Sequence, residues 1–354
     1  KYFVCMEKKM TKQVICGGLP IGGGAPVSIQ SMLNIDVRRF ECARAQLDAL
    51  VDAGADIVRI AVPDADSAAA FGEMKKVSKV PLVADIHFDY RLALESVAAG
   101  ADKIRINPGN IGADDRVKAV ANACKAAGVP IRIGVNSGSL EKNILAKYGS
   151  PTPRAMVESG LYHISLLEKF DFDDIVLSLK SSNVVTMYNA YVLAAEKCRY
   201  PLHLGVTEAG TAANGTVKSA AGIGGLLLRG IGDTIRVSLT DDPVREVETG
   251  KRLLKALGLR TGGVKFVSCP TCGRTKIDLI KIANEAEQRL KDCDKNITVA
   301  IMGCVVNGPG EAREADIGIA GGDNCGVLFK NGEIIKKVPE SALLDELLAE
   351  IEKL

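Results

Sequence analysis

The sequence predicts an α/β protein in which a TIM (β/α)8 barrel is followed by a smaller α+β domain. Eight short β-branched runs alternate with Ala-rich segments of helical period before residue 262. Eight strand–helix units in about 250 residues are typical of a TIM barrel. Trp is absent and aromatic residues are only 4%, so Val, Ile, Leu and Ala must fill the core, as in parallel sheets buried on both faces. The alternative, a doubly wound sheet, usually has fewer units and a nucleotide loop after its first strand.

The predicted barrel strands begin mostly 22 to 33 residues apart, with one gap of 44 residues before the sixth strand. Helical periodicity is clearest in three of the segments between or after them, Cys42–Ala53, Asp114–Ala127 and Pro243–Leu257. In chain order the predicted strands are Val27–Met32, Asp56–Val62, Pro81–His87, Lys103–Pro108, Pro130–Asn136, Asp174–Lys180, Pro201–Thr207 and Thr234–Thr240.

The pattern changes around residues 259–263, which places a domain boundary there and predicts domains of residues 1–261 and 262–354. In the second domain we expect a hairpin that turns at Asn331-Gly332, because that dipeptide favours tight β-turns. The other expected elements are strands at Val264–Ser268, Ile297–Met302 and Ile317–Ala320 and helices at Lys276–Asp292 and Ser341–Leu354.

Composition and charge exclude several classes of protein. Lys plus Arg is 45 and Asp plus Glu is 43, a balance that argues against a general nucleic-acid binder. No run approaches the roughly 20 apolar residues that span a bilayer, so no membrane partner is expected. The start, Lys1–Met10, lacks the apolar region of a signal peptide, which favours a cytoplasmic protein. In that compartment the ten cysteines are expected to be thiols or metal ligands rather than disulfides.

Charged and polar residues alternate with apolar ones along most of the predicted barrel strands. Residues i and i+2 share one face of a strand, so we expect the polar set to point into the barrel near its carboxyl ends, where barrel enzymes place their active sites. Each residue taken alone could be a solvated strand end or half of an ion pair. The set comprises Arg59, Asp85, His87, Arg105, Asn107, Arg132, Asn136, Ser178, Lys180, Arg236 and Ser238.

Cations dominate this set: four arginines and one lysine face only two carboxylates at the strand ends, Asp85 and Glu208. Burying so many cations together is costly without anionic partners, and Arg forks suit phosphoryl oxygens. The sequence therefore predicts a multiply charged anion, phosphate or diphosphate, as the ligand. His163 and His203 are interpreted as core or surface histidines.

The second domain contains three cysteines at strand ends: Cys269 and Cys272 in a Cys-x-x-Cys motif, and Cys304. A redox dithiol leaves Cys304 unexplained, and zinc requires a fourth ligand such as Cys325. An iron–sulfur cluster on three cysteines leaves one iron open to an oxygen ligand such as Glu311. The spacing favours a cluster over zinc, and both over a dithiol.

Several long motifs carry a resemblance to a known family. They are Ala84-Asp-Ile-His-Phe88, Arg105-Ile-Asn-Pro-Gly-Asn-Ile-Gly112, Arg132-Ile-Gly-Val-Asn136, His203-Leu-Gly-Val-Thr-Glu-Ala-Gly210, Ser268-Cys-Pro-Thr-Cys-Gly-Arg274 and Met302-Gly-Cys-Val-Val-Asn-Gly-Pro-Gly-Glu311. With these motifs the chain resembles the 4-hydroxy-3-methylbut-2-enyl diphosphate synthases, iron–sulfur enzymes of the non-mevalonate isoprenoid pathway. The likeness runs from about Lys12 to near the end.

The resemblance implies a TIM barrel and a domain like those of sulfite reductases, in a homodimer. It implies reductive opening and dehydroxylation of methylerythritol cyclodiphosphate, with ferredoxin or flavodoxin as electron donor. A [4Fe–4S] cluster would be held by Cys269, Cys272, Cys304 and Glu311. Positions where the family binds substrate are matched by Arg59, Arg105, Arg132, Lys180 and Ser268, with Asn107 and Asn136 beside them; Arg236 matches a strand motif. The family's Q-S-M-T-N-T-D reads Gln30-Ser-Met-Leu-Asn-Ile-Asp36 here, so two hydroxyls are lost.

Glu208 is the candidate proton donor or base, with Asp85 and His87 as further candidates. Two other functions remain open: a non-redox phosphosugar lyase or isomerase whose small domain is braced by zinc, and an electron carrier without barrel chemistry. Neither explains why an Arg-rich barrel mouth and a three-cysteine site occur in one chain.

Overall fold

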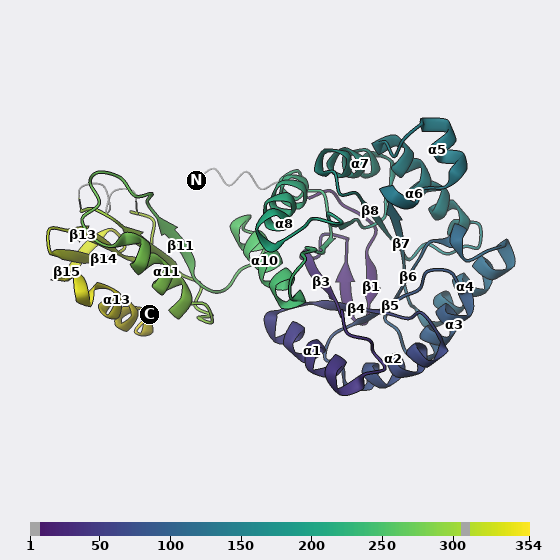
Figure 1. Ribbon diagram of the computed structural model, residues 1–354, viewed down its shortest axis with the longest axis horizontal. Helices are drawn as coiled ribbons and strands as arrows, with labels where there is room; N and C mark the ends of the chain where they lie inside the picture. The colour runs from purple at the N-terminus through teal and green to yellow at the C-terminus, as the bar shows by residue number, and fades with distance from the viewer. Residues whose placement is uncertain (1–7, 306–311) are drawn as a thin grey trace. The chain divides into compact units, whose positions relative to one another are not determined.

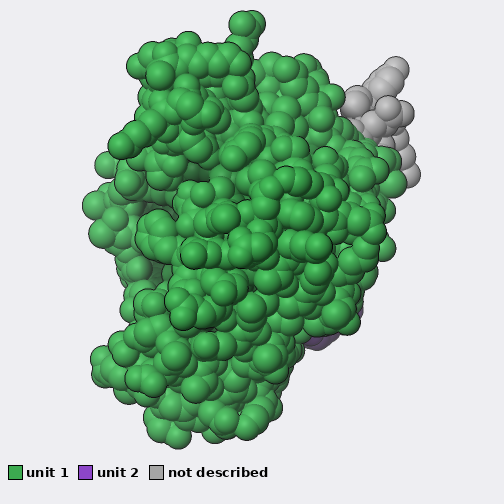
Figure 2. All heavy atoms as spheres, turned by 90° about the vertical axis from the view of Figure 1, so that its right-hand side faces the viewer, with its two compact units in different colours: residues 1–260 green, residues 261–354 purple. Residues whose placement is uncertain are grey.

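The computed structural model describes residues 8–305 and 312–354. The chain divides into two compact units, residues 1–260 and 261–354, which are considered separately below (Figure 2). No described helix is both long enough and apolar enough to cross a membrane.

Unit 1 is a parallel barrel surrounded by helices, as predicted (Figure 1). The eight-stranded sheet has the order β8-β7-β6-β5-β4-β3-β10-β9, and a bridge between Leu177 and Leu202 brings its two ends together. The strands are β3 (Ser28–Met32), β4 (Ile57–Ala61), β5 (Leu82–Asp85), β6 (Lys103–Ile106), β7 (Ile131–Asn136), β8 (Ile175–Lys180), β9 (His203–Leu204) and β10 (Thr234–Ile235). The helices are α1 (Phe40–Ala53), α2 (Ala65–Val77), α3 (Tyr90–Ala98), α4 (Asp114–Ala127), α5 (Lys142–Tyr148), α6 (Pro153–Glu168), α7 (Val184–Lys197), α8 (Ala212–Ser219), α9 (Gly225–Leu227) and α10 (Pro243–Ala256).

The last two barrel strands, β9 and β10, are much shorter than the predicted runs of residues 201–207 and 234–240. A Cβ on Gly205 would lie 3.0 Å from the carbonyl oxygen of Arg236, so the backbone segments that contain these two residues approach closely. After Gly205 the regular ladder of hydrogen bonds between strands is replaced by isolated hydrogen bonds, such as that from the Thr207 N–H to the Ser181 carbonyl. The chain stays in place without forming regular sheet.

A hairpin that the sequence analysis did not predict closes the amino-terminal end of the barrel. Its strands, β1 (Val14–Cys16) and β2 (Leu19–Ile21), are joined by Gly17 and Gly18, whose φ values of 54° and 86° suit a tight turn. Val14, Cys16 and Ile21 pack against Ile57, Val83 and Val176, which come from the beginnings of β4, β5 and β8. The hairpin therefore covers the floor of the barrel with apolar side chains, and the opposite end is left for a site.

The strand period separates two environments in the barrel. Outward residues such as Val58 and Ile60 join the main core under the helices. On the inner face of β4, apolar Ile57 at the floor is followed two residues later by Arg59 at the mouth. The same alternation on the neighbouring strands places the charged residues at the carboxyl end.

Unit 2 is a five-stranded mixed sheet in the order β11-β12-β13-β14-β15. Its strands are β11 (Lys265–Ser268), β12 (Thr298–Met302), β13 (Ile317–Gly322), β14 (Cys325–Lys330) and β15 (Glu333–Pro339), and its helices are α11 (Leu279–Arg289) and α13 (Leu343–Glu352). Arg289 of α11 donates to Asp345 of α13 over 2.8 Å, which joins the two helices. The predicted Asn331-Gly332 hairpin is confirmed between β14 and β15.

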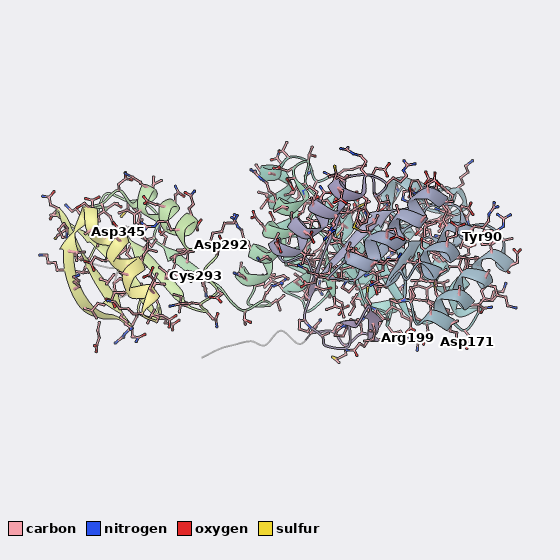
Figure 3. All side chains as sticks on the ribbon, turned by 90° about the horizontal axis from the view of Figure 1, so that it is seen from below. Tyr90, Asp171, Arg199, Asp292, Cys293 and Asp345 are labelled. Carbon is pink, nitrogen blue, oxygen red and sulfur yellow. The ribbon has the colours of Figure 1, made fainter. Side chains whose placement is uncertain are left out.

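The first helix of unit 2 begins later than predicted. The Asp278 side chain accepts the Lys281 N–H and so caps α11 at residue 278, where the sequence pattern had suggested a start at Lys276. Cys293, just past the end of this helix, packs against the unit's apolar core (Figure 3).

Candidate active site

A cavity of about 460 Å³ opens at the carboxyl ends of the barrel strands, and most of the residues that line it are polar or charged. The structure brings together in this wall all eleven members of the predicted polar set, together with Met32, Phe88, Asn110, Gly134, Ser139 and Thr207. Those eleven are Arg59, Asp85, His87, Arg105, Asn107, Arg132, Asn136, Ser178, Lys180, Arg236 and Ser238. The inward direction of these side chains, predicted from the strand period, is confirmed.

Strand register places Asp85, Arg105 and Arg132 at one level of the sheet and Lys180 further along, opposite Asn136. Asp85 pairs with Arg105 and Arg105 with Arg132 across three neighbouring strands, while Asn136 pairs with Lys180. Gly134 makes room among them, because a Cβ at that position would lie 2.7 Å from the Arg105 Nε. The strands therefore fix the cations before any ligand arrives.

Asp85 is the carboxylate at the centre of this group. Its oxygens lie 3.6 Å from the Arg59 Nε, 3.3 Å from an Arg105 terminal nitrogen and 3.6 Å from the His87 Nε2. Burial alone would raise the pKa of Asp85, but Arg59, His87 and Arg105 outweigh it and hold that pKa well below its usual range. Asp85 is therefore ionised at neutral pH, which suits it to orienting cations rather than to donating a proton.

The cations exceed the carboxylates, and the excess is buried. Burial lowers the pKa of Arg59 to about 10. It also lowers the pKa values of Arg132 and Lys180 well below their ordinary values, and neighbouring arginines lower them further. Arg132 is only 1% exposed, yet its Nε and one terminal nitrogen have no hydrogen-bond partner among the described residues. The Nε atoms of Arg105 and Arg236 are likewise unpartnered within the described chain.

Unpartnered guanidinium donors that surround a cavity define an anion site. A buried donor that lacks an acceptor costs roughly 1–3 kcal/mol, more when it is charged, and a ligand rich in anionic oxygens removes that cost. Asn107 adds a neutral donor. Its Oδ1 accepts the Gly134 N–H over 2.8 Å, which leaves its NH2 group free to donate to a ligand.

Sequence reasoning missed one carboxylate, Glu246 of α10. Its Oε2 lies 3.6 Å from an Arg236 terminal nitrogen, and its Oε1 accepts the Leu239 N–H over 2.8 Å. Burial raises the pKa of Glu246, against the opposing effect of Arg236. The signal was present, since Glu246 lies on the buried face of α10 with Val247 and Gly250.

Glu208 is placed apart from the other predicted residues. It is exposed, has a φ of 51°, and lines a neighbouring hollow that shares Asn136, Ser139 and Thr207 with the main cavity. His203 is fully buried inside the barrel, with neither ring nitrogen partnered within the described residues. His163 is buried on α6, with hydrogen-bonding partners.

The cysteine site lies at one end of the sheet in unit 2. Cys269 follows β11 and Cys304 follows β12, two neighbouring parallel strands whose register pairs Ser268 with Ile301. The Cys269 Sγ accepts the Gly303 N–H over 3.2 Å. Backbone and side-chain hydrogen bonds from Arg274 lower the pKa of the Cys272 thiol. These features suit thiolate ligands.

The remaining predictions for unit 2 stay open. The described residues contain no preassembled group of three metal-binding side chains. The predicted ligand Glu311 falls outside the described residues. Cys325 begins β14 opposite Gly322. Ser268 is exposed and donates its hydroxyl to the Ile301 carbonyl over 3.0 Å.

The parallel barrel and the cation-rich mouth at its carboxyl ends define the class: a TIM-barrel enzyme with a site for an anionic ligand. The particular family follows from comparison with known proteins. The GcpE TIM-barrel domain matches residues 11–251 and the GcpE C-terminal domain matches residues 265–353, so the chain belongs to the GcpE family.

Close relatives cover the whole chain. The 4-hydroxy-3-methylbut-2-en-1-yl diphosphate synthase (flavodoxin) of Clostridium perfringens is 60% identical over 347 residues, which are 98% of this chain and 99% of that protein. The synthase of the same name from Caldanaerobacter subterraneus is 59% identical, with 98% of each protein covered. The family resemblance seen in the sequence motifs is confirmed.

Solved structures of distant proteins share the barrel. Dihydropteroate synthase from Stenotrophomonas maltophilia aligns with a TM-score of 0.51 at 17% identity, over 71% of this chain and all of that one. Type I 3-dehydroquinate dehydratase from Clostridium difficile aligns with a TM-score of 0.52 at 14% identity, over 70% of this chain and 98% of that one. At such identities the likeness extends to the fold alone.

Proposed function

We propose that this protein reduces 2-C-methyl-D-erythritol 2,4-cyclodiphosphate to (E)-4-hydroxy-3-methylbut-2-enyl diphosphate. One carbon–oxygen bond to a phosphate breaks, which opens the ring, and one hydroxyl leaves as water. The reaction consumes two electrons and two protons, and the electrons come from flavodoxin. The observation that carries the proposal is a set of buried guanidinium nitrogens on Arg105, Arg132 and Arg236 that surround one cavity and have no hydrogen-bond partner among residues 8–305 and 312–354.

The barrel mouth binds and orients the diphosphate. Arg132 and Arg105 donate to phosphoryl oxygens through fixed guanidinium groups, and Lys180 and the Asn107 amide add donors from neighbouring strands. Asp85 keeps Arg59 and Arg105 in place. Because the strands fix these groups beforehand, the negative charge that develops on the leaving phosphate is stabilised without reorganisation of the protein.

The residues of the second unit suit a [4Fe–4S] cluster. Cys269, Cys272 and Cys304 would hold three irons and Glu311 the fourth, as the family resemblance implies. The Gly303 N–H on the Cys269 sulfur and the lowered pKa of Cys272 both favour thiolates. When bound, the cluster supplies single electrons and a Lewis-acidic iron for a substrate oxygen. Ser268, beside Cys269, is proposed as a further substrate contact.

Glu208 is proposed to move the proton, because Asp85 is held ionised by its cationic neighbours. The hollow that Glu208 lines adjoins the main cavity at Asn136 and Ser139. His87, whose Nε2 lies 3.6 Å from Asp85, is the second candidate. We propose that the reaction takes place in the cytoplasm and that the protein is a homodimer, as its family resemblance implies.

The test combines an anaerobic absorption spectrum with counts of iron, zinc and acid-labile sulfide, followed by an assay with the cyclodiphosphate and reduced flavodoxin. The expected result is broad visible absorption that bleaches on reduction, equal iron and sulfide, and formation of the open-chain diphosphate. A colourless chain that holds one zinc after attempted cluster reconstitution would overturn the proposal. It would favour the non-redox phosphosugar lyase or isomerase.

A further inference from the structure

Two loops that line the cavity are held by one buried side chain outside it. The first loop follows β6 and contributes Asn107 and Asn110 to the cavity wall. The second follows β7, whose last residue Asn136 lines the cavity, and contributes Ser139. Between them on α6 lies His163, which is 1% exposed and does not itself line the cavity.

Each nitrogen of the His163 ring is bound to one of these loops. Its Nδ1 accepts the N–H of Gly109 over 3.1 Å, in the short helical turn Pro108–Asn110 of the first loop. Its Nε2 lies 2.6 Å from the Oε1 of Glu141, at the end of the second loop. The two contacts require the neutral ring with its proton on Nε2, because Nδ1 is occupied as an acceptor.

The residues around His163 support its contacts with the two loops. A Cβ on Gly109 would lie 2.8 Å from the His163 Cε1, so the first loop can approach the ring only with glycine there. Ser159, one turn before His163 on α6, also donates to the Glu141 Oε1, over 3.1 Å. Burial would raise the pKa of Glu141, but the hydrogen bonds from His163, its own backbone and Ser159 lower it to about 2, so Glu141 is a stable anionic acceptor.

We propose that His163 is a positioning residue that couples the two loops and so sets the spacing of Asn107, Asn110 and Ser139 around the substrate. His163 acts through Gly109 and Glu141 and does not touch the substrate. The inference rests on the proposed function, because it assigns these loops to the cyclodiphosphate. Displacing a binding group by about 1 Å is enough to cost up to 10²-fold in rate.

The test uses three variants of the full cluster-loaded chain. His163→Asn keeps an amide oxygen near the Nδ1 position and loses the contact to Glu141. His163→Gln keeps a donor near the Nε2 position and loses the contact to Gly109. His163→Ala loses both. Ser165→Ala, an exposed position on the same helix, is the control.

Amide hydrogen exchange gives a readout that needs no turnover. We expect exchange in residues 107–112 to rise about tenfold in the Ala and Gln variants, and exchange in residues 137–141 to rise similarly in the Ala and Asn variants. Kinetically, His163→Ala should raise KM for the cyclodiphosphate about tenfold, with kcat within about threefold and visible absorbance unchanged.

Two results would overturn the inference: a uniform rise in exchange over the whole barrel with no selective loss in these loops, or an unchanged KM in His163→Ala. A wild-type chain that fails to convert the cyclodiphosphate would instead refute the proposed function. The loop coupling would then still be decided by exchange, and by whether inorganic diphosphate protects the same two segments in the wild type and not in His163→Ala.

Discussion

The barrel mouth of unit 1 and the cysteine site of unit 2 are organised in opposite ways. In the barrel, strand register fixes Arg105, Arg132 and Lys180 inside a closed wall, and the ligand supplies only the missing negative charge. In unit 2, Cys269 and Cys304 follow neighbouring strands and Cys272 is exposed. There the ligand would draw the donors together. The comparison shows that the fold preorganises the barrel site, whereas the described residues of unit 2 contain no preassembled group of metal-binding side chains.

The largest effect is expected from Cys304→Ser, which should abolish the function of the cysteine site and leave the barrel site unchanged. Loss of one thiolate should abolish the visible absorbance and lower turnover by more than about 10³-fold, because a cluster ligand is removed. Binding of inorganic diphosphate to the barrel, measured by calorimetry, should stay within about twofold of the wild type, because the cations of the mouth are untouched.

Cys293→Ser is the matched control, since that thiol packs against the core of the same unit. Cys325→Ser separates the metal hypotheses: a cluster retained in this variant agrees with iron–sulfur ligation, whereas metal loss would favour zinc with Cys325 as fourth ligand. A normal spectrum in Cys304→Ser would exclude Cys304 as a ligand.

The next effect is expected from Glu208→Gln, which should spare both sites and still stop the reaction. General acid–base groups typically contribute 10²–10⁴-fold, so turnover should fall about 10³-fold while the absorbance and diphosphate binding are preserved. The substitution keeps the side chain's size at a backbone position with a φ of 51°. Turnover near that of the wild type would remove Glu208 from the mechanism and leave His87 as the candidate.

Features that depend on local sequence patterns could be predicted, whereas features that depend on tertiary contacts could not. The direction of Arg59, Arg105 and Arg132 follows from a period of two along each strand, a local property that one sequence displays. The shortness of β9 and β10 is a feature of how the two strands pair in the barrel, which no local pattern encodes. The floor hairpin was missed because strands of three residues are too short to show a period.

The roles of side chains that act through tertiary contacts were the hardest to predict from the sequence. Glu246 and His163 lie on helices, and their roles depend on which loop packs against them. His163 was interpreted only as a core or surface histidine, because its buried position and its bonds to Gly109 and Glu141 are tertiary features. In unit 2, the Cys-x-x-Cys spacing predicts a ligand pair, but the choice between cluster and zinc depends on geometry that spacing does not specify.

A smaller loss of turnover is expected from Arg132→Met, and this loss should come with unchanged or increased stability. Removing a buried, unpartnered cation should leave the free energy of unfolding of the unliganded protein unchanged or raise it by about 1 kcal/mol. It should lower kcat/KM about 10²-fold and weaken diphosphate binding, because donors to the phosphoryl oxygens are lost.

The same change at Arg199, an exposed arginine away from the mouth, is the control (Figure 3). Urea unfolding and calorimetry measure the two quantities. A destabilised variant with normal diphosphate affinity would show that Arg132 is structural, and the preorganised anion site would lose its central member.

The smallest effect on activity is expected from Lys103→Met, on the inner face of β6 two residues before Arg105. The Lys103 Nζ is buried and unpartnered among the described residues, and it does not line the cavity. Burial lowers the pKa of Lys103 to about 8 from its ordinary 10.5. Cys16, its neighbour in the floor, stays a neutral thiol because burial raises the pKa of that group.

The sign follows from linkage. Between pH 8 and 10.5 the unfolded chain binds a proton at Lys103 that the folded chain has released, so this residue makes stability rise with pH in that window. Lys103→Met should therefore be more stable than the wild type at pH 7, by up to about 3 kcal/mol, and the difference should shrink by pH 10. Turnover should be unchanged. A difference that is constant with pH would show that the Lys103 charge is compensated in the folded barrel, and that its floor, unlike its mouth, holds no unbalanced cation.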